Sequence, residues 1–449
     1  MNPLKQYIEL FREHRSALDG NSAPVMNALR DEALAVLESA ELPDNRTEGY
    51  AYTSLREMYA PDYGVNVNRV NIPVDVAASF HCGVPGLSTM LGVVVNDMFR
   101  PSDRLASLLP SGVEFCSLRE AAQKHPELVA SLYGKTATLT DPGVALNTLL
   151  VQDGVFVHIG RGVTLEKPLQ LVNIFSSPGA LLAARRVLIY VEDNAEGALL
   201  CCDHTQDNER NYLSNQVVEI VLGRNARFGY YDIEESSEKT SRHCRLYARQ
   251  QERSNLVVNG MTLTCGTTRN DYNIDVVGEG CETFLGGMAI ESGTQHVDNA
   301  SRLSHLAPHG HSTQLFKYVV DGEAKGVFDG RILVAPEATH TEAYQSNRNL
   351  LASTTAKMYT RPQLEIYCDD VKCSHGATTG QLDAEALFYM QARGIPEAEA
   401  RVMLMQAFMA DVIDTVRIDS LRERLRLLVE KRFVGRELFC GDCAASHRC

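Results

Sequence analysis

A short pattern recurs between about residue 144 and residue 380, and it constrains the fold more than any other feature. Each copy contains an apolar run, a polar turn with Gly or Asp, a small residue and a second apolar run, as in VLIYVEDNAEGALLCC, VVEIVLGRNARFGYYDI, YNIDVVGEGCETFLGGMAI and LEIYCDDVKCSHGATTG. The copies follow one another at intervals on the order of 30 residues. Such repeats predict a β-solenoid, in which each coil buries its inward residues against the next coil. A β-sandwich or jelly roll also contains short alternating strands and is the alternative, but repetition of the unit favours the solenoid.

The array is expected to begin with GVALNTLLVQDGVFVHIGRGVTLEKPLQLVNIF. Its runs of Val, Ile, Leu and Phe are separated by Gly, Asp-Gly and Pro, so we predict strands throughout this segment. Upstream, apolar residues recur at steps of three and four, which predicts helices over the first sixty residues. The expected division is a helical and mixed region over 1–140, the solenoid over 141–380, a helical domain over 381–436 and a Cys-rich tail over 437–449.

The chain is expected to become helical again after Gly380. Asp383 is placed to cap one helix that ends at Gly394, and Pro396 begins the next. This second helix, RVMLMQAFMADVID, is apolar on nearly every side, so it is either buried or completed by a partner. Its methionines suit an adaptable partner surface. The third helix, IDSLRERLRLLVEKRF, has an ordinary apolar stripe.

Composition excludes several classes of protein. A chain of 449 residues with 44% hydrophobic and 22% charged residues can build two or three folded domains. A net charge of -14 argues against nucleic acid or an anionic membrane as a partner. The charged start and the absence of a long apolar run predict a cytoplasmic protein without a membrane span. No phosphate loop of the G-x-x-x-x-G-K-[ST] type occurs, so the chain should not hydrolyse ATP itself.

The 12 cysteines do not form an evident disulfide framework in a chain this long. Cys244, Cys265 and Cys281 lie in apolar runs and are expected to be reduced core residues. Cys201 and Cys202 are adjacent, so their side chains should lie on opposite faces of a strand. The tail CGDCAASHRC offers four metal-ligand side chains, but a chain end is often unstructured, and both interpretations stay open: Cys440, Cys443, His447 and Cys449.

Cys373 and His375 form the strongest candidate site. On an extended segment two residues apart, a thiol and an imidazole lie on the same face, which makes them half of a metal site. Two ligands of this kind bind iron or zinc only weakly, so further ligands are needed. Two other clusters have simpler interpretations. His305, His309 and His311 are expected to be solvated imidazoles in a coil turn rather than a metal cluster. Asp369 and Asp370 are expected to form a charged turn rather than an acid/base pair.

Several motifs together resemble a known family. TEAYQSNRNLLAS, RPQLEIYCDDVKCSHGATTG and ALFYMQARGI resemble the C-terminal half of the SufD subunits in the SufB/SufD family, the scaffold of the SUF iron-sulfur cluster assembly system. The similarity is nearly continuous from Gly326 to Asp414. Weaker similarity includes HLAPHGHSTQLFKYVVDG and RTEGYAYTSL, where Tyr50 replaces the usual Trp. SufB typically has Glu after the corresponding histidine, where this chain has Gly376, so the SufD branch is favoured.

The resemblance implies a right-handed parallel β-helix between two helical regions, in a scaffold that is not an enzyme. It implies a heterodimer with SufB through the β-helix and docking of the ATPase SufC on the C-terminal helices. The apolar surface there predicts the contact residues Phe388, Tyr389, Met405 and Phe408. His375 and Cys373 match residues expected to hold iron or a nascent cluster shared with SufB, with no cofactor bound stably. The tail has no family counterpart.

Two alternative functions and two further questions stay open at this point. The chain resembles SufB less closely, but a SufB-like scaffold that itself carries the cluster is one alternative. A carbohydrate-active β-helix enzyme is another, and it would need paired carboxylates on one coil face and a secreted location. The sequence also does not decide between a heterocomplex and a homodimer, or whether a flavin takes part.

Overall fold

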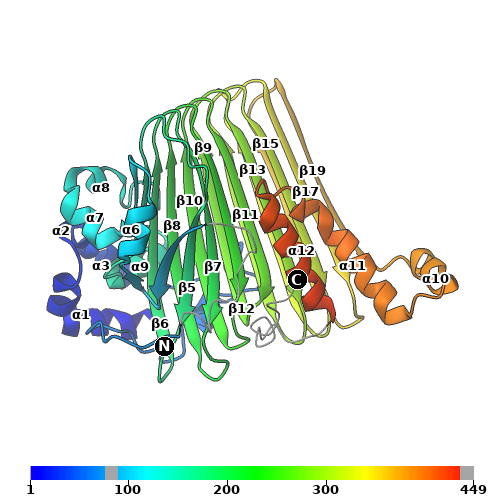
Figure 1. Cartoon of the computed structure of the whole chain (residues 1–449), viewed down its shortest axis with the longest axis horizontal. Coiled ribbons are helices and arrows are strands. Elements are labelled where there is room, and N and C mark those ends of the chain that lie inside the picture. Colours follow the sequence, from blue (N-terminus) through cyan, green and yellow to red (C-terminus); the bar gives the residue numbers. More distant parts are fainter. Residues whose placement is uncertain (1, 76–88, 435–449) are drawn as a thin grey trace.

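The computed structural model describes residues 2–75 and 89–434 of the chain, which build two long sheets between helical regions (Figure 1). The predicted mainly β class, with a parallel β-solenoid flanked by helices, is confirmed. The tail residues Cys440, Cys443, His447 and Cys449 lie outside the described residues. Eight described helices precede the main strand array: α1 Leu4–Gly20, α2 Pro24–Asn27, α3 Arg30–Ser39, α4 Leu55–Met58, α6 Asp103–Leu108, α7 Leu118–Lys124, α8 Pro126–Leu132 and α9 Pro142–Leu150.

Successive strands from β4 onward alternate between the two sheets, so each coil contributes one strand to each. The nine-stranded sheet contains β3 Val113–Ser117, β4 Val155–Ile159, β6 Leu181–Val191, β8 Tyr212–Leu222, β10 Thr240–Gln250, β12 Thr267–Val276, β14 His296–His305, β16 Lys325–Val334 and β18 Lys357–Ile366. The ten-stranded sheet contains β1 Met90–Val95, β2 Met98–Arg100, β5 Leu169–Phe175, β7 Glu196–Thr205, β9 Arg227–Glu235, β11 Asn255–Thr264, β13 Glu282–Glu291, β15 His311–Val320, β17 Thr341–Leu351 and β19 Val371–Gln381. Strands β1 to β3 thus join the sheets although they precede residue 141.

Equivalent residues of neighbouring coils lie side by side because the parallel strands pair in register. Val187, Val218 and Leu246 face one another across β6, β8 and β10, and all three are buried between the sheets. Each coil therefore covers the apolar side chains of the one before it, which is how the repeat makes a continuous core. At one corner, the left-handed turn positions in successive coils are held by Asn194 and Asn225, residues that tolerate a positive φ.

The predicted strand over the start of GVALNTLLVQDG is wrong, because Pro142–Leu150 forms helix α9. Asp141 caps this helix by accepting hydrogen bonds from the backbone of Gly143 and Val144, and Pro142 occupies its first turn. All residues from Gly143 to Leu150 are buried. A helix buried on every side has no polar stripe, so its apolar run cannot be distinguished from a buried strand by periodicity.

The N-terminal helices cover the outer face of the nine-stranded sheet at its first strands. Their apolar residues pack with Phe156, Leu182, Leu188 and Leu213 from that sheet. Residues 44–59, which we call the strap, then run along the same face toward the last coils. The strap is attached there by the Tyr52 ring, which stacks on Tyr359 of β18 with the ring centroids 3.7 Å apart.

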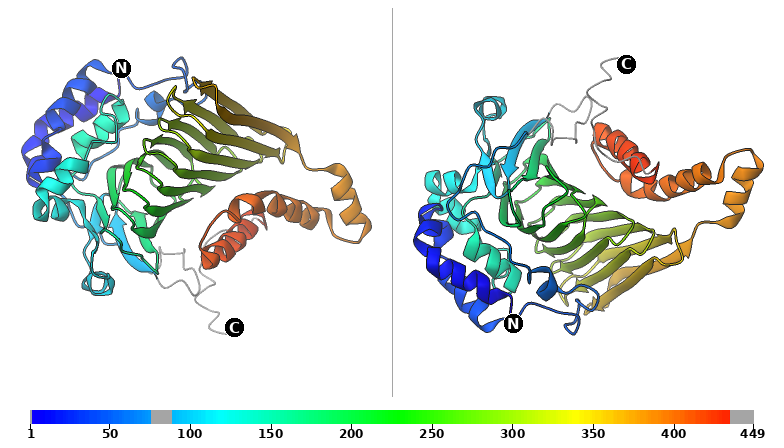
Figure 2. Two further views of the ribbon diagram at one scale, coloured as in Figure 1. Left: turned by 90° about the horizontal axis from the view of Figure 1, so that it is seen from above. Right: turned by 90° about the horizontal axis from the view of Figure 1, so that it is seen from below.

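The C-terminal helices form an arm consisting of α10 Ala384–Ala392, α11 Glu397–Ile413 and α12 Asp419–Val434. Asp383 caps α10 as predicted, by accepting from the backbone of Glu385 and Ala386. Helices α11 and α12 fold back along the outer face of the ten-stranded sheet, whereas α10 extends beyond the end of the solenoid (Figure 2). No residue of α10 is buried.

The cysteine predictions are confirmed for the core thiols. Cys244, Cys265 and Cys281 are buried and free. Cys201 belongs to the core between the sheets, while its neighbour Cys202 packs in the cluster beneath the arm, so the two side chains lie on opposite faces.

Candidate functional site

The solenoid ends in two edge strands, and the predicted site residues lie on one of them. Strand β18 is the last of the nine-stranded sheet, and β19 is the last of the ten-stranded sheet. Cys373 pairs in register with Ala343 of β17, and His375 pairs with Gln345. In β17, Ala343 and Gln345 are buried while Tyr344 between them is partly exposed. The register therefore places Cys373 and His375 on the face that points between the two sheets, as the spacing predicted.

Cys373 is half-buried and packs against an apolar cluster that includes Ile332, Val334 and Ala343. A second thiol, Cys368 in the turn before β19, packs against the same cluster. Burial raises the pKa of the Cys373 thiol, and the neighbouring Cys368 raises it further. A raised pKa keeps Cys373 protonated until a cation replaces its proton. Sequence reasoning missed Cys368, although the C-x-x-x-x-C spacing around the Asp-Asp turn was a visible signal.

His375 is exposed, since no further described coil covers it. It continues an inward row of polar side chains formed by Gln314 and Gln345 in the two preceding coils of this sheet. The Gln345 amide donates to Gln314 at 3.1 Å, and the Ser301 hydroxyl donates to the same oxygen at 2.8 Å. Within residues 2–75 and 89–434, no group of three or more His, Cys, Asp or Glu side chains can hold a metal ion. Cys373 and His375 therefore lie on one face at the open end of a polar row, and a metal held there would need ligands from elsewhere.

The structure divides the four predicted contact residues of the arm into two pairs. Phe388 and Tyr389 on α10 are 71% and 59% exposed. Met405 and Phe408 on α11 are partly buried and pack against the cluster beneath the arm. The Lys317 ammonium of β15 donates to the Phe408 backbone oxygen at 2.7 Å, which fixes α11 on the sheet. The packing of Met405 and Phe408 thus holds α11 in place, and α11 in turn supports α10, the helix of Phe388 and Tyr389.

The histidine cluster is only partly solvated. His309 and His311 are exposed, as expected. The prediction is wrong for His305, which is fully buried and lies 2.8 Å from the Ser312 hydroxyl. Burial lowers the pKa of His305 to about 4. Its position explains the difference, because it is an inward residue at the end of β14, and the following turn closes over its ring at Gly310. Asp369 and Asp370 occupy the predicted charged turn.

A network of charged side chains lies inside the solenoid, and sequence reasoning missed it. The Arg242 guanidinium contacts Asp203 at 3.1 Å, Glu234 at 3.7 Å and also Asp232. All four side chains are buried. Burial raises the pKa of Glu234 to about 7, while the Arg242 charge opposes that rise. The signal was the acidic residues inside the strand segments CCDHT and YYDIEE, since charges there need a partner in another coil.

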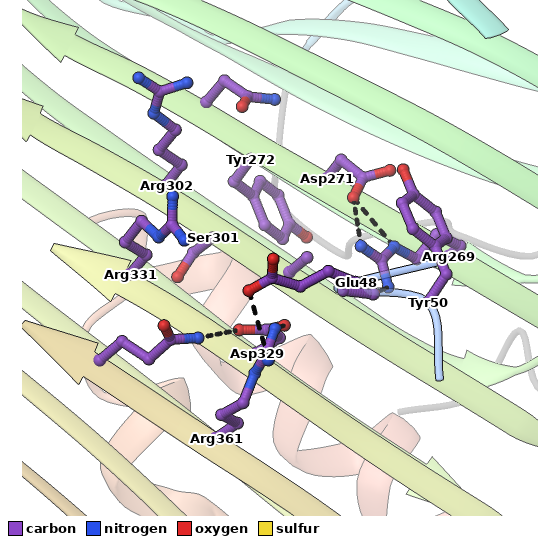
Figure 3. Close-up of a pocket in the computed structure, with 14 residues that line it drawn as sticks. Glu48, Tyr50, Arg269, Asp271, Tyr272, Ser301, Arg302, Asp329, Arg331 and Arg361 are labelled. Carbon is purple, nitrogen blue, oxygen red and sulfur yellow. Dashed lines mark hydrogen bonds and ion pairs between the residues drawn. The ribbon is translucent and has the colours of Figure 1, made fainter. Parts of the chain in front are cut away.

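A groove of about 370 Å³ opens on the outer face of the nine-stranded sheet (Figure 3). Arg302 and Arg331 lie on one side of it, and Arg269, Asp271 and Tyr50 lie on the other, as Figure 3 shows. The strap forms part of its wall. Sequence reasoning did not find this groove, because its residues come from four strands and from the strap.

The described residues contain no helix long and apolar enough to cross a membrane.

The family model described as "SUF system FeS cluster assembly, SufBD core domain" matches residues 174–408. A second, "SufBD protein N-terminal region", matches residues 1–171. The chain is 30% identical over 432 residues to an iron-sulfur cluster assembly SufBD family protein of Synechocystis sp., covering 94% of both chains. It is 28% identical over 292 residues to the iron-sulfur cluster assembly protein SufD of Escherichia coli, covering 65% of this chain and 69% of that protein. The identity to SufD of Bacillus subtilis is 25% over 328 residues, with 72% and 75% covered.

Proposed function

Because the chain belongs to the SufBD family of the SUF iron-sulfur cluster assembly system, we propose that it is a non-enzymatic scaffold subunit of the SufD type. One observation carries the proposal. Among the described residues, the solenoid ends in two strand edges that no further strand covers, and Cys373 and His375 on one of them would be an incomplete ligand set. A second chain that pairs with these edges would supply the missing ligands.

The edges of β18 and β19 are the proposed surface for SufB. Both strands are 10 or 11 residues long and have a neighbour on one side only among the described residues. Unpaired backbone donors and acceptors on such an edge are a ready template for strands of another chain. A SufB-type partner with the same architecture would offer matching edges. A second copy of this chain would offer them too, so a homodimer is the competing state in isolation.

The cargo would be iron or a nascent cluster, held transiently at this interface. The Cys373 thiol would lose its proton as it binds the metal, and a ring nitrogen of His375 would be a second ligand. Thiolate and imidazole are ligands that iron accepts. Binding by two ligands alone is weak, so the site is expected to fill only in the complex.

The arm is the proposed docking surface for the ATPase SufC. Phe388 and Tyr389 are large apolar side chains exposed on a helix that extends away from the solenoid. Exposed aromatic residues of this kind are frequent anchors of protein interfaces. Lys317 and the packing of Met405 and Phe408 hold α11 in place and so position α10.

The test of the half-site compares complex yield and cluster content in one preparation. We expect His375→Ala to assemble normally with SufB and SufC but to lose most of its cluster, because an exposed ligand is removed without opening a cavity. His309→Ala, which removes another exposed histidine, is the control and should keep both. If complex yield and cluster content fall together in His375→Ala, or neither falls, His375 is not a ligand. A cluster held by the isolated wild-type chain after anaerobic reconstitution would instead indicate a SufB-like carrier.

The test of the arm is a binding measurement with SufC. Phe388→Asp with Tyr389→Asp should weaken SufC binding by about 30-fold or more, as expected for the loss of an interface anchor. Leu108→Asp, at a residue that is 53% exposed on α6, is the control and should bind normally. Unchanged SufC affinity in the double variant, with an intact fold, would refute this docking surface.

A further inference from the structure

The groove of Figure 3 is built on a row of side chains that donate hydrogen bonds. The register pairs Asn273 of β12 with Arg302 of β14, Arg302 with Arg331 of β16, and Arg331 with Gln363 of β18. All four side chains line the groove. Four donors from four coils thus cross the outer face of the nine-stranded sheet in one line.

Among the described residues, the two arginines in the middle of this row have one carboxylate partner between them. Like charges directly opposite one another on neighbouring strands destabilise a sheet. The Arg331 Nε lies 3.3 Å from a Glu365 carboxylate oxygen, so one side of that guanidinium forms an ion pair. The Arg302 side chain has no hydrogen bond or ion pair within the part of the chain that the structure describes. The pair therefore carries one positive charge more than Glu365 neutralises, and a bound anion would balance that charge.

The remaining charges of the groove are already paired with one another. The Asp271 carboxylate contacts Arg269 at 2.8 Å, and the Asp329 carboxylate contacts Arg361 at 2.5 Å. Between these pairs the register places Ala300, whose methyl group leaves open space beside Arg302 and Arg331. The open space is thus adjacent to Arg302, which has no ion-pair partner among the described residues, and to Arg331.

We propose that this groove binds a phosphate-bearing small molecule, with the phosphate bridging the guanidinium groups of Arg302 and Arg331. A guanidinium donates two parallel hydrogen bonds to phosphate oxygens, and two facing arginines can grip one phosphate from both sides. The volume of about 370 Å³ falls within the range of small-molecule sites. Tyr50 and the donor Asn273 would contact the rest of the ligand, whereas the Gln363 amide already donates to the Asp329 carboxylate at 3.2 Å. This site is separate from the half-site and does not depend on the proposed scaffold function.

Glu48 of the strap acts as a built-in competitor in this arrangement. Its carboxylate is 79% exposed and lies 3.8 Å from the Arg361 guanidinium. In Figure 3 the Glu48 side chain lies between the two sides of the groove. A second anion must enter against this negative charge, so removal of the charge should favour binding.

The experiment is calorimetric titration of the full chain with inorganic pyrophosphate at fixed low salt. We expect one saturable site that weakens as salt rises. Arg302→Gln and Arg331→Gln should each weaken binding by about tenfold or more, because each removes a charge-assisted hydrogen bond. Arg249→Gln removes an exposed arginine of β10 that does not line the groove, and it should leave the affinity unchanged. Glu48→Gln should tighten binding.

Three results would overturn the proposal. The first is no saturable binding to the wild-type chain. The second is an equal loss of affinity in Arg249→Gln, which would show general attraction of an anion to a positive surface. The third is unchanged affinity in Arg302→Gln and Arg331→Gln when thermal unfolding shows an intact fold. Titration with AMP in place of pyrophosphate then separates a nucleotide site from a site for an inorganic anion.

Discussion

One buried carboxylate links the N-terminal region to the solenoid, in addition to the apolar packing between them. Glu219 of β8 accepts hydrogen bonds from the backbone of Gly134, Thr136 and Ala137 at 3.0 to 3.1 Å. It also pairs with Arg186 of β6 at 2.5 Å, and both side chains are fully buried. This carboxylate therefore satisfies three backbone donors of the helical region and one charge of the sheet.

We expect Glu219→Ala to lower the free energy of unfolding by about 3 to 5 kcal/mol. The reason is that Arg186 would stay buried without a counter-charge, and three backbone donors would lose their acceptor. The assay is urea unfolding followed by circular dichroism. Glu196→Ala, at an exposed acidic residue of β7, is the control and should change the free energy of unfolding by less than about 0.5 kcal/mol.

A double variant tests the cause of that loss. If the uncompensated charge is the main cost, Arg186→Met added to Glu219→Ala should recover part of the stability, although it is a second core substitution. A Glu219→Ala variant that loses less than about 1 kcal/mol, or a double variant whose losses simply add, would refute this reasoning.

Three further predictions concern pH, the arm and its cap. Burial lowers the pKa of His305 from 6.5 to about 4 in the folded protein. On acidification His305 therefore gains its proton in the unfolded chain before it does so in the folded one. The free energy of unfolding should fall by about 3 kcal/mol between pH 6.5 and pH 4. His305→Gln should remove that part of the pH dependence of urea unfolding. Lys317→Met loses the hydrogen bond to the Phe408 backbone and the ion pair with Asp411, so the arm should become more sensitive to limited proteolysis. Asp383→Ala should destabilise α10 by about 1 kcal/mol, seen as faster amide exchange in that helix alone.

Local patterns were enough to predict the fold class and the shared face of Cys373 and His375. The strand-turn-strand unit recurs because in-register parallel coils place equivalent residues on equivalent faces. Cys373 and His375 share a face because side chains alternate along a strand, and Asp383 caps a helix through bonds to its own neighbours. Each of these inferences depends on residues that are close in sequence.

Features that depend on contacts between coils could be found only in the three-dimensional structure. Helix α9 could not be predicted from its apolar run, because burial on every side removes the periodicity that distinguishes a helix from a strand. His305 is buried because the next turn covers it, which no local pattern records.

From the sequence alone, a solenoid followed by a helical arm could be predicted, with Cys373 and His375 on one face of a strand near the end of the solenoid. Contacts between coils place these residues on an edge strand, and they bring Arg302 and Arg331 together on one side of the groove. The two arginines are separated by a full coil in the sequence. Their proximity follows from the strand register, which is set by the turns and the inward core of every coil between them.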